Sequence, residues 1–125
     1  MILDTNALSA FADDEAHVTA ILDRSALMAI PVVVLGEFGF GMAQSRKRER
    51  YERWLEELLP LSRILEITRE TVDHYTAVRL ELKRIGKPIP ANDVWIAALC
   101  RQHRLPLLSR DRHFDVIRDI QRIGW

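Results

Sequence analysis

Apolar and polar positions along the chain predict strands and helices in alternation. A short apolar run opens the chain and ends at an acid, Asp4. Residues 6–23 have a helical pattern that breaks near DDEA, and ALMAIP has the pattern of a buried strand that ends at Pro31. We expect Pro31 at the first position of the next helix, where its fixed φ is already suitable.

Apolar residues at spacings of three and four predict the helices that follow. VVVLGEFGFG is one such helix, and KRERYERWLEELL is a second, amphipathic one. The apolar side of the second helix consists of Tyr51, Trp54, Leu55 and Leu58. SRILEIT, in which Leu65 and Ile67 alternate with polar residues, predicts a strand, and Thr68 then caps a long helix over 69–85. The apolar face of this long helix is Val72, Tyr75, Val78 and Leu82.

The last part of the chain predicts one more helix and two short strands. Gly86 and the following KPIP end the long helix in a turn, and Asn92 is the expected cap of a helix that holds VWIAALC. LPLLS has the pattern of a short buried strand. Ile120 and Ile123 indicate an edge strand near the C-terminus.

The alternation of strands and helices favours a parallel sheet, because parallel strands need a crossover connection between them. We expect a three-layer α/β/α sandwich with a central, mainly parallel sheet of four to five strands. The length of 125 residues suits one domain over residues 1–125. In such sheets, functional sites lie beyond the carboxyl ends of the strands.

Composition narrows the class of protein. Lysine and arginine balance aspartate and glutamate at 18 each, so the overall charge gives no general attraction to nucleic acid. The lone cysteine, Cys100, lies in an apolar helical pattern, which favours a reducing compartment and a cytoplasmic protein. No apolar run approaches the roughly 18 residues of a membrane span, so we expect no membrane association.

Three aspartates stand where a strand ends or a helix begins. Asp4 follows the first strand, Asp93 opens the helix of VWIAALC, and Asp111 follows the strand of LPLLS. Each has an ordinary structural explanation, because aspartate often caps a helix or stabilises a turn. Asp111 also has two arginines beside it for an ion pair. Taken alone, Asp4 is as consistent with a cap as with a functional site.

Glu37 differs from these aspartates because it interrupts an apolar helical pattern. A buried carboxylate is costly unless it is paired, protonated or bound to a metal. Four acids that meet at one edge of a sheet would raise each other's pKa values, and a divalent cation relieves that repulsion. Mg²⁺ or Mn²⁺ prefers oxygen ligands and can polarise a phosphodiester. The pattern therefore predicts a metal-dependent site for phosphodiester hydrolysis.

Several separated motifs give the chain a resemblance to a known family. These motifs are ILDTN at the start, a VxxxGEFxFG-like segment around Glu37, NDVWIAA around Asp93 and SRDRHFD near the end. In this order and spacing they resemble the PIN domain. Among PIN proteins the chain is similar to the VapC-type toxin ribonucleases of bacterial type II toxin–antitoxin pairs, and the resemblance covers essentially its whole length.

The resemblance implies a PIN-like fold and an endoribonuclease that uses Mg²⁺ or Mn²⁺ and metal-activated water. Its substrate would be structured tRNA, rRNA or mRNA, so that cleavage inhibits translation and growth. It also implies a VapB-like antitoxin partner and a homodimer. The implied catalytic acids are Asp4, Glu37, Asp93 and Asp111. The implied metal ligands are Asp4, Asp93 and Asp111. The implied supporting residues are Thr5, Asn6, Asn92 and Ser109. The family usually has threonine at position 109, and serine keeps the hydroxyl.

Basic and apolar residues near this site each have two interpretations. RKRERYER is either a solvated helix face or part of a basic rim that holds the RNA backbone. The proposed rim consists of Arg46, Lys47, Arg50, Arg110 and Arg112. The stretch around Phe38, Phe40 and Met42 is either core or, by resemblance, a groove for the antitoxin. The four histidines share no metal-ligand spacing, so we expect ordinary surface residues.

Two other functions stay open from the sequence. An aspartyl-phosphate phosphatase or a receiver domain also gathers acids at a sheet edge. Such a phosphatase needs a second acid two residues after the first, where this chain has Asn6, and receivers have no helix-borne acid like Glu37. A PIN-fold module that binds RNA without catalysis is the other alternative, and the complete set of four acids argues against it.

Overall fold

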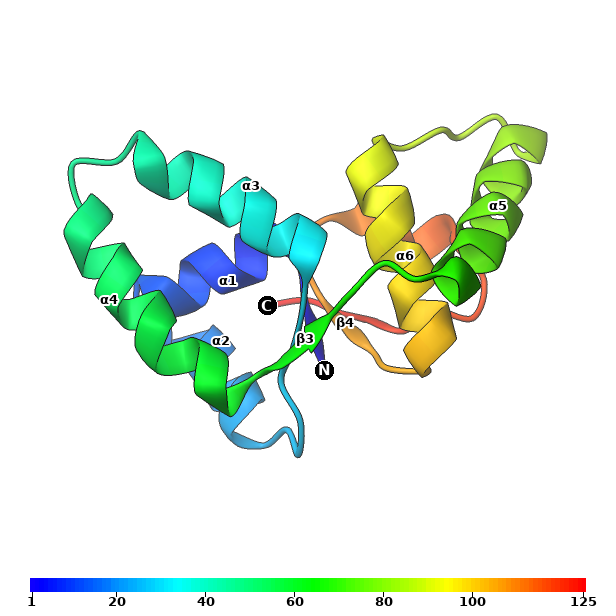
Figure 1. Cartoon of the computed structure of the whole chain (residues 1–125). Helices are drawn as coiled ribbons and strands as arrows, with labels where there is room; N and C mark the ends of the chain where they lie inside the picture. Colours follow the sequence, from blue (N-terminus) through cyan, green and yellow to red (C-terminus); the bar gives the residue numbers. More distant parts are fainter.

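The computed structural model describes residues 1–125, in which five short strands alternate with six α-helices (Figure 1). The strands are β1 (Ile2–Leu3), β2 (Ala29–Pro31), β3 (Arg63–Leu65), β4 (Leu107–Leu108) and β5 (Arg122–Ile123). The helices are α1 (Thr5–Ala12), α2 (Ala16–Asp23), α3 (Val32–Ala43), α4 (Arg48–Leu58), α5 (Arg69–Arg84) and α6 (Ala91–His103). Two short 3₁₀ helices are η1 (Leu59–Leu61) and η2 (Arg112–Val116). None of the helices has the length and apolar character needed to span a lipid bilayer.

The sheet is wholly parallel, with strand order β3-β2-β1-β4-β5. The chain moves outward from β1 through β2 to β3 and then returns to β4 and β5 on the other side of β1. Because crossovers between parallel strands are right-handed, this reversal puts later helices on the opposite face. Figure 1 shows α1 to α4 on one side of the strands and α5 and α6 on the other. The predicted three-layer sandwich is confirmed.

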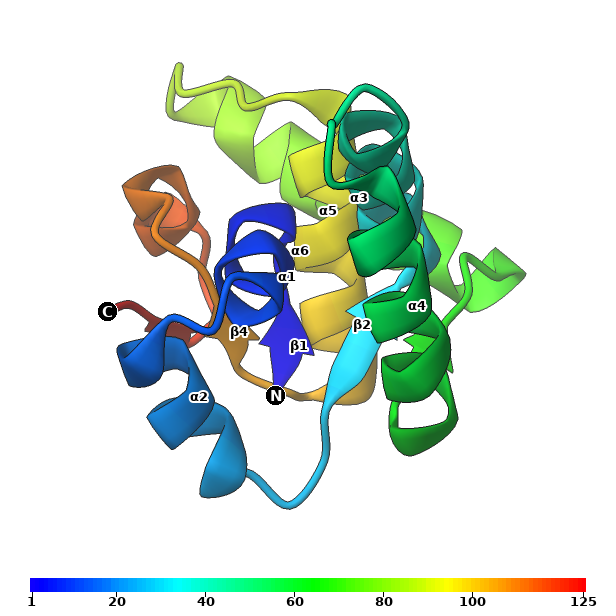
Figure 2. The same ribbon diagram turned by 90° about the vertical axis from the view of Figure 1, so that its left-hand side faces the viewer.

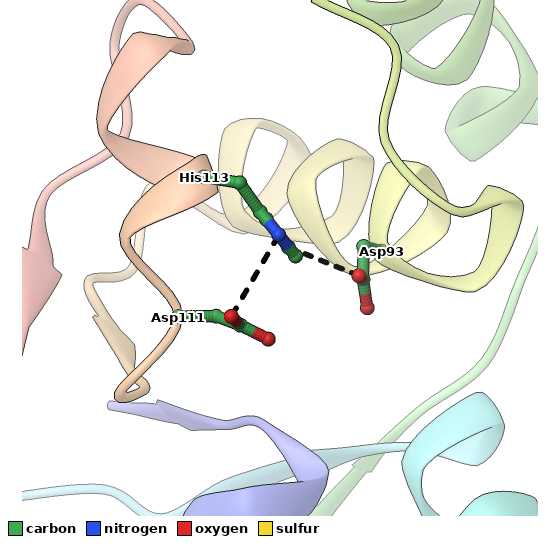
Figure 3. A group of neighbouring side chains, drawn as sticks. All are labelled: Asp93, Asp111 and His113. Atoms are coloured by element: carbon green, nitrogen blue, oxygen red, sulfur yellow. Dashed lines mark ion pairs between the residues drawn. The ribbon is translucent and has the colours of Figure 1, made fainter.

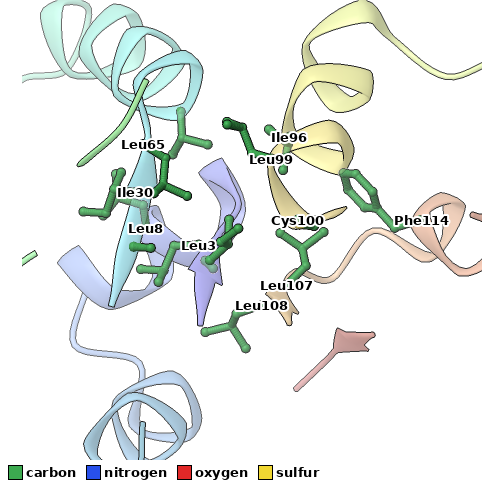
Figure 4. Packing of buried hydrophobic residues seen from close by; sticks show 14 of the residues in the cluster. Leu3, Leu8, Ile30, Leu65, Ile96, Leu99, Cys100, Leu107, Leu108 and Phe114 are labelled. Atoms are coloured by element: carbon green, nitrogen blue, oxygen red, sulfur yellow. The ribbon is translucent and has the colours of Figure 1, made fainter. Parts of the chain in front are cut away.

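One apolar cluster of 25 buried residues fills the space between the sheet and both helical layers (Figures 2 and 4). Strands β1 and β4 are buried on both faces, so that Leu3 and Leu108 have no exposed surface. Truncating either side chain to alanine would cost about 2–5 kcal/mol in the free energy of unfolding. These strands therefore form a rigid base for the residues that follow them, Asp4 and Ser109.

Two predicted helix starts are wrong. Pro31 is the last residue of β2, where it pairs with Leu65, and it precedes α3 instead of opening it. The sheet requires extended backbone there, and Pro31 has ψ of 143°. Asn92 does not cap α6, which begins at Ala91. The carbonyl of Pro90 already accepts the N–H groups of Asp93 and Val94, so the helix starts before Asn92.

Two predicted apolar positions are also exposed. Ile67 lies beyond β3, because the partner strand β2 ends opposite Leu65 and leaves nothing for Ile67 to pair with. Val72 on α5 is 38% exposed, and the buried residue in its place is Thr71, whose hydroxyl donates to Gln102 of α6. Gly86 has φ of +66°, as suits the predicted turn at the end of α5.

Candidate metal-binding site

A hollow of about 630 Å³ opens beyond the carboxyl ends of β1 and β4. The strand order reverses between these strands, and in open α/β sheets this is where ligands bind. The lining includes all four predicted acids, Asp4, Glu37, Asp93 and Asp111. It also includes three of the predicted supporting residues, Thr5, Asn6 and Asn92. The fold thus brings together acids from four separate segments of the chain.

Asp4 is nearly buried, with 4% of its surface exposed. Its Oδ1 accepts the Thr5 N–H at 2.8 Å, so Asp4 does cap α1. Its Oδ2 accepts the Asn6 amide at 3.0 Å and the Ser109 hydroxyl at 2.6 Å. The structural and the functional explanation of Asp4 are therefore compatible, because the cap fixes a carboxylate that also lines the hollow.

Ser109 links the ends of β1 and β4. The side chain is fully buried, and its hydroxyl donates to Asp4 while it accepts the Asp111 N–H at 3.0 Å and the Asn6 amide at 3.2 Å. Asn6 in turn accepts the Arg110 N–H at 3.2 Å through its Oδ1. The bond from Ser109 to Asp4 joins residues 105 positions apart, and together these bonds fix both the Asp4 carboxylate and the backbone that carries Asp111.

Glu37 reaches the hollow from α3 and is half-buried. Its Oε1 accepts the Thr5 hydroxyl at 3.2 Å, which joins α3 to the start of α1. Oε2 accepts no hydrogen bond from the protein. The Glu37 carboxylate is therefore held in place by one oxygen while the other stays available.

Asp93 and Asp111 lie on the other side of the hollow, on the first turn of α6 and in the loop after β4. Neither carboxylate accepts a hydrogen bond from the protein. Asp93 has 14% of its side chain exposed. Burial and then the charge of Asp4 raise the pKa of Asp93 to about 6, with smaller increases from Glu37 and Asp111 and an opposing effect of His113.

His113 lies directly against these two acids, although its sequence position suggested a surface residue. Its Nε2 is 3.0 Å from Asp93 Oδ2, and its Nδ1 is 3.7 Å from Asp111 Oδ1 (Figure 3). The prediction that all four histidines are ordinary surface residues is therefore wrong for His113. One sequence feature could have indicated it, because His113 stands two residues after a predicted site acid at the start of a short helical turn.

The residues present suit a divalent cation. Asp93, Asp111 and His113 each offer a ligand atom, and the three atoms lie within 4.8 Å of one another. Asp93 has a raised pKa and accepts no hydrogen bond, and the buried Nε2 of His113 beside it makes none either, so a cation would satisfy both groups. Carboxylate oxygens are the ligands that Mg²⁺ and Mn²⁺ prefer, so the donor set fits the predicted metal.

The predicted basic rim divides into two groups. Arg110 contacts both oxygens of Glu15 at 2.6 Å and lies over the Trp125 ring, 4.6 Å from its centroid. Arg50 lies 4.0 Å from Asp14 and donates to the backbone of α1. The other three residues are exposed and make no ion pair in the structure; they are Arg46, Lys47 and Arg112.

The apolar residues of α3 are partly buried in the core and partly exposed. Phe38 is buried and packs edge-on against Tyr51, with Trp54 beside it, so the core explanation holds for this residue. Phe40 is 73% exposed. A small hollow of about 190 Å³ lies along the same helix, between Phe38, Met42 and Tyr51.

Comparisons with known proteins agree with this architecture. The PIN domain family model matches residues 1–120. Toxin FitB from Neisseria gonorrhoeae is 31% identical over 121 residues, which cover 89% of this chain and 87% of that protein. Ribonuclease VapC2 from Rickettsia felis is 29% identical over 101 residues, which cover 78% and 75% of the two chains.

Solved structures give the same picture. The structure of VapBC2 from Rickettsia felis bound to a promoter DNA fragment contains a chain that matches with a TM-score of 0.89 at 23% identity, over 99% of this chain and 97% of that one. FitAcB from Neisseria gonorrhoeae matches with a TM-score of 0.80 at 29% identity, over 98% and 95%. The fold of this chain is that of these proteins.

Proposed function

The chain belongs to the PIN-domain family, and we propose that it is a VapC-type endoribonuclease that depends on a divalent metal ion. We take residues 1–125 to form one PIN domain. The observation that carries the proposal is the convergence of Asp4, Glu37, Asp93 and Asp111 on one hollow at the reversal of the strand order. Burial first, and then the charges of the neighbouring carboxylates, raise the pKa of Asp93, and a divalent cation would relieve that cost.

Asp4, Asp93 and Asp111 are the proposed ligands for Mg²⁺ or Mn²⁺. A bound ion would supply positive charge to a phosphodiester and would make an attacking water more acidic. Ser109 and Asn6 hold the Asp4 carboxylate in one orientation, which a ligand with a fixed coordination geometry requires.

Glu37 and Asn92 have different proposed roles. Thr5 holds Glu37 through Oε1, and its second oxygen is available to accept a proton from the water that attacks the phosphorus. Asn92 lines the hollow next to Asp93, where its amide can donate to a phosphate oxygen. The Asn6 amide donates to Asp4, so the position where a phosphatase of the aspartyl type needs a second acid holds a hydrogen-bond donor.

The basic rim is the proposed contact surface for the RNA backbone. Arg46, Lys47 and Arg112 are exposed and without ion pairs, so they can bind phosphates directly. Arg50 and Arg110 lie against Asp14 and Glu15, so each would have to leave its acid before it could bind a phosphate. We propose structured cellular RNA, such as tRNA, rRNA or mRNA, as the substrate, and inhibition of translation and growth as the result.

A VapB-like antitoxin is the proposed protein partner, and a homodimer is the proposed assembly. The similar solved structures include VapBC and FitAB complexes, which supports such a partner for this chain. The exposed Phe40 and the neighbouring small hollow on α3 offer an apolar surface for a partner peptide.

The proposal is tested by incubating the purified protein with a mixed RNA pool in EDTA and then adding Mn²⁺ or Mg²⁺ in excess. Cleavage is expected only after metal is added, and only with an intact site. Asp4→Asn should be inactive, whereas Asp73→Asn, which changes an exposed acid on α5, should cleave like the wild type. Cleavage that persists in EDTA or in Asp4→Asn would overturn the proposal.

A further inference from the structure

His113 is held in a defined position at the edge of the acidic hollow. It lies on η2, and the next residue, Phe114, is fully buried in the core. The two rings lie 4.7 Å apart between centroids, so the buried phenyl ring supports the imidazole. Figure 3 shows the side chains of His113, Asp93 and Asp111 directed toward one another from η2, α6 and the loop after β4.

The contact between His113 and Asp93 is close but is not a hydrogen bond. Nε2 has no contact with solvent and no hydrogen-bond partner, even though Asp93 Oδ2 is only 3.0 Å away. The distance is short enough for a hydrogen bond, so the direction of approach must be unsuitable. His113 and Asp93 therefore place a nitrogen and a carboxylate oxygen side by side without a hydrogen bond between them.

Two ligands of one metal ion have this geometry. Neighbouring ligands at about 2.1 Å from an octahedral ion are about 3.0 Å apart, and each points at the ion, about 45° away from the line that joins them. Nε2 and Asp93 Oδ2 have this separation, and no hydrogen bond joins them. Asp111 supplies the third ligand atom within 4.8 Å.

We propose that His113 supplies a nitrogen ligand to the ion that Asp93 and Asp111 hold, and that it makes the site prefer Mn²⁺ over Mg²⁺. This inference rests on the proposed metal site and adds a residue and a metal preference to it. Imidazole is a good ligand for transition metals, whereas Mg²⁺ strongly prefers oxygen. A site of carboxylates alone would discriminate less between the two ions.

An ordinary ion pair between a protonated His113 and Asp93 makes a different prediction. In that case the imidazole and the metal would compete for Asp93, and replacing His113 would improve binding of both ions equally. If His113 is a ligand, its replacement weakens Mn²⁺ binding and leaves Mg²⁺ binding nearly unchanged. The direction of the change therefore separates the two interpretations.

The experiment is pulsed electron paramagnetic resonance of Mn²⁺ bound to the full chain without a histidine tag. We expect modulation from a directly coordinated ¹⁴N nucleus in the wild type and in the control His17→Gln, which changes an exposed histidine on α2. We expect none in His113→Gln. Calorimetric titrations should show that His113→Gln lowers the Mn²⁺ affinity at least about tenfold and the Mg²⁺ affinity less than about threefold.

The wild-type spectrum tests the inference even if a variant fails to fold, and His113→Asn provides a smaller replacement at the same position. Mn²⁺ binding and RNA cleavage without nitrogen modulation would overturn the role of His113 alone. An equal change in the affinities for the two ions would overturn it as well. A wild-type chain that neither binds Mn²⁺ nor cleaves RNA would overturn the proposed function and this inference together.

Discussion

The two sides of the acidic hollow differ in how the protein treats their carboxylates. Asp4 accepts hydrogen bonds from Thr5, Asn6 and Ser109, so the fold itself compensates its burial. Asp93 accepts none and has a pKa raised to about 6. The difference teaches that folding satisfies the Asp4 carboxylate with hydrogen bonds, whereas it leaves the Asp93 carboxylate without any, beside His113 and open to the proposed cation.

This difference has an energetic consequence. A buried carboxylate that accepts hydrogen bonds lowers the stability of the fold only a little, whereas a buried carboxylate without a partner lowers it more. We therefore expect Asp93 to lower the stability of the metal-free protein, and the proposed metal ion would recover that stability. Removing a charge should accordingly have opposite effects on folding at the two sides and the same effect on catalysis.

The largest expected effect is on RNA cleavage. Asp93→Asn and Asp111→Asn should each lower the cleavage rate at least about 100-fold at saturating Mn²⁺, because each removes a proposed ligand. Rates are measured on a defined RNA under single-turnover conditions. Near wild-type cleavage by either variant would show that the metal does not act at the Asp93 side of the hollow.

The second effect concerns the hydroxyl that orients Asp4. Ser109→Ala should lower the cleavage rate about 10–100-fold, because Asp4 loses a buried donor and the loop of Asp111 loses its anchor. Ser109→Thr keeps the hydroxyl and should retain most activity. Ser25→Ala removes a hydroxyl bound to the backbone of α2 and serves as the control. Equal activity of the alanine and threonine variants at position 109 would show that the hydroxyl does not position Asp4 for cleavage.

The third effect is stabilisation by metal. At a free Mn²⁺ concentration of 100 times Kd, the free energy of unfolding should rise by about 2.7 kcal/mol, because only the folded chain gathers the ligands. The double variant Asp93→Asn/Asp111→Asn should show almost no rise. Chemical denaturation with and without the ion measures both. An equal rise in the double variant would place the ion elsewhere.

The smallest effect is the pH dependence of the metal-free protein. The folded pKa of Asp93, about 6, lies above its ordinary value of 3.8, so the folded chain binds this proton more tightly than the unfolded chain. The stability that the proton confers is complete below about pH 3.8 and is lost as the pH rises through 6. Asp93→Asn should therefore unfold at higher denaturant than the wild type at pH 8, by on the order of 2 kcal/mol, and this advantage should disappear near pH 4.

Asp4→Asn provides the contrast for that experiment. It disturbs a carboxylate whose hydrogen bonds are made, so it should destabilise the chain by about 1–3 kcal/mol. The two substitutions remove the same charge from the same hollow. If both change the stability at pH 8 in the same direction, the contrast between the two sides is wrong.

The architecture and the four acids were predictable because their patterns are local. Each strand is a short apolar run; Asp4 and Asp111 follow β1 and β4, and Asp93 lies in the first turn of α6. Glu37 was recognisable because it breaks an apolar helical pattern. Parallel strands then bring their carboxyl ends to one edge, so the hollow follows from the order of the elements.

The contacts between side chains within the site were not predictable, because they depend on which distant segments of the chain lie side by side. The bond from Ser109 to Asp4 exists because β4 pairs beside β1. His113 reaches Asp93 because the buried Phe114 fixes η2 against α6, which no spacing in the sequence indicates. The start of α6 was misplaced because extended backbone at Pro90 already provides the first helical acceptor.

The most direct test of the account is to titrate the metal-free wild-type chain with Mn²⁺ and to measure bound ion and RNA cleavage in the same samples. The account predicts that the cleavage rate rises in proportion to occupancy of a site that Asp93→Asn/Asp111→Asn abolishes. Full cleavage before the site fills, or undiminished cleavage by the double variant, would contradict the claim that these carboxylates hold the catalytic ion.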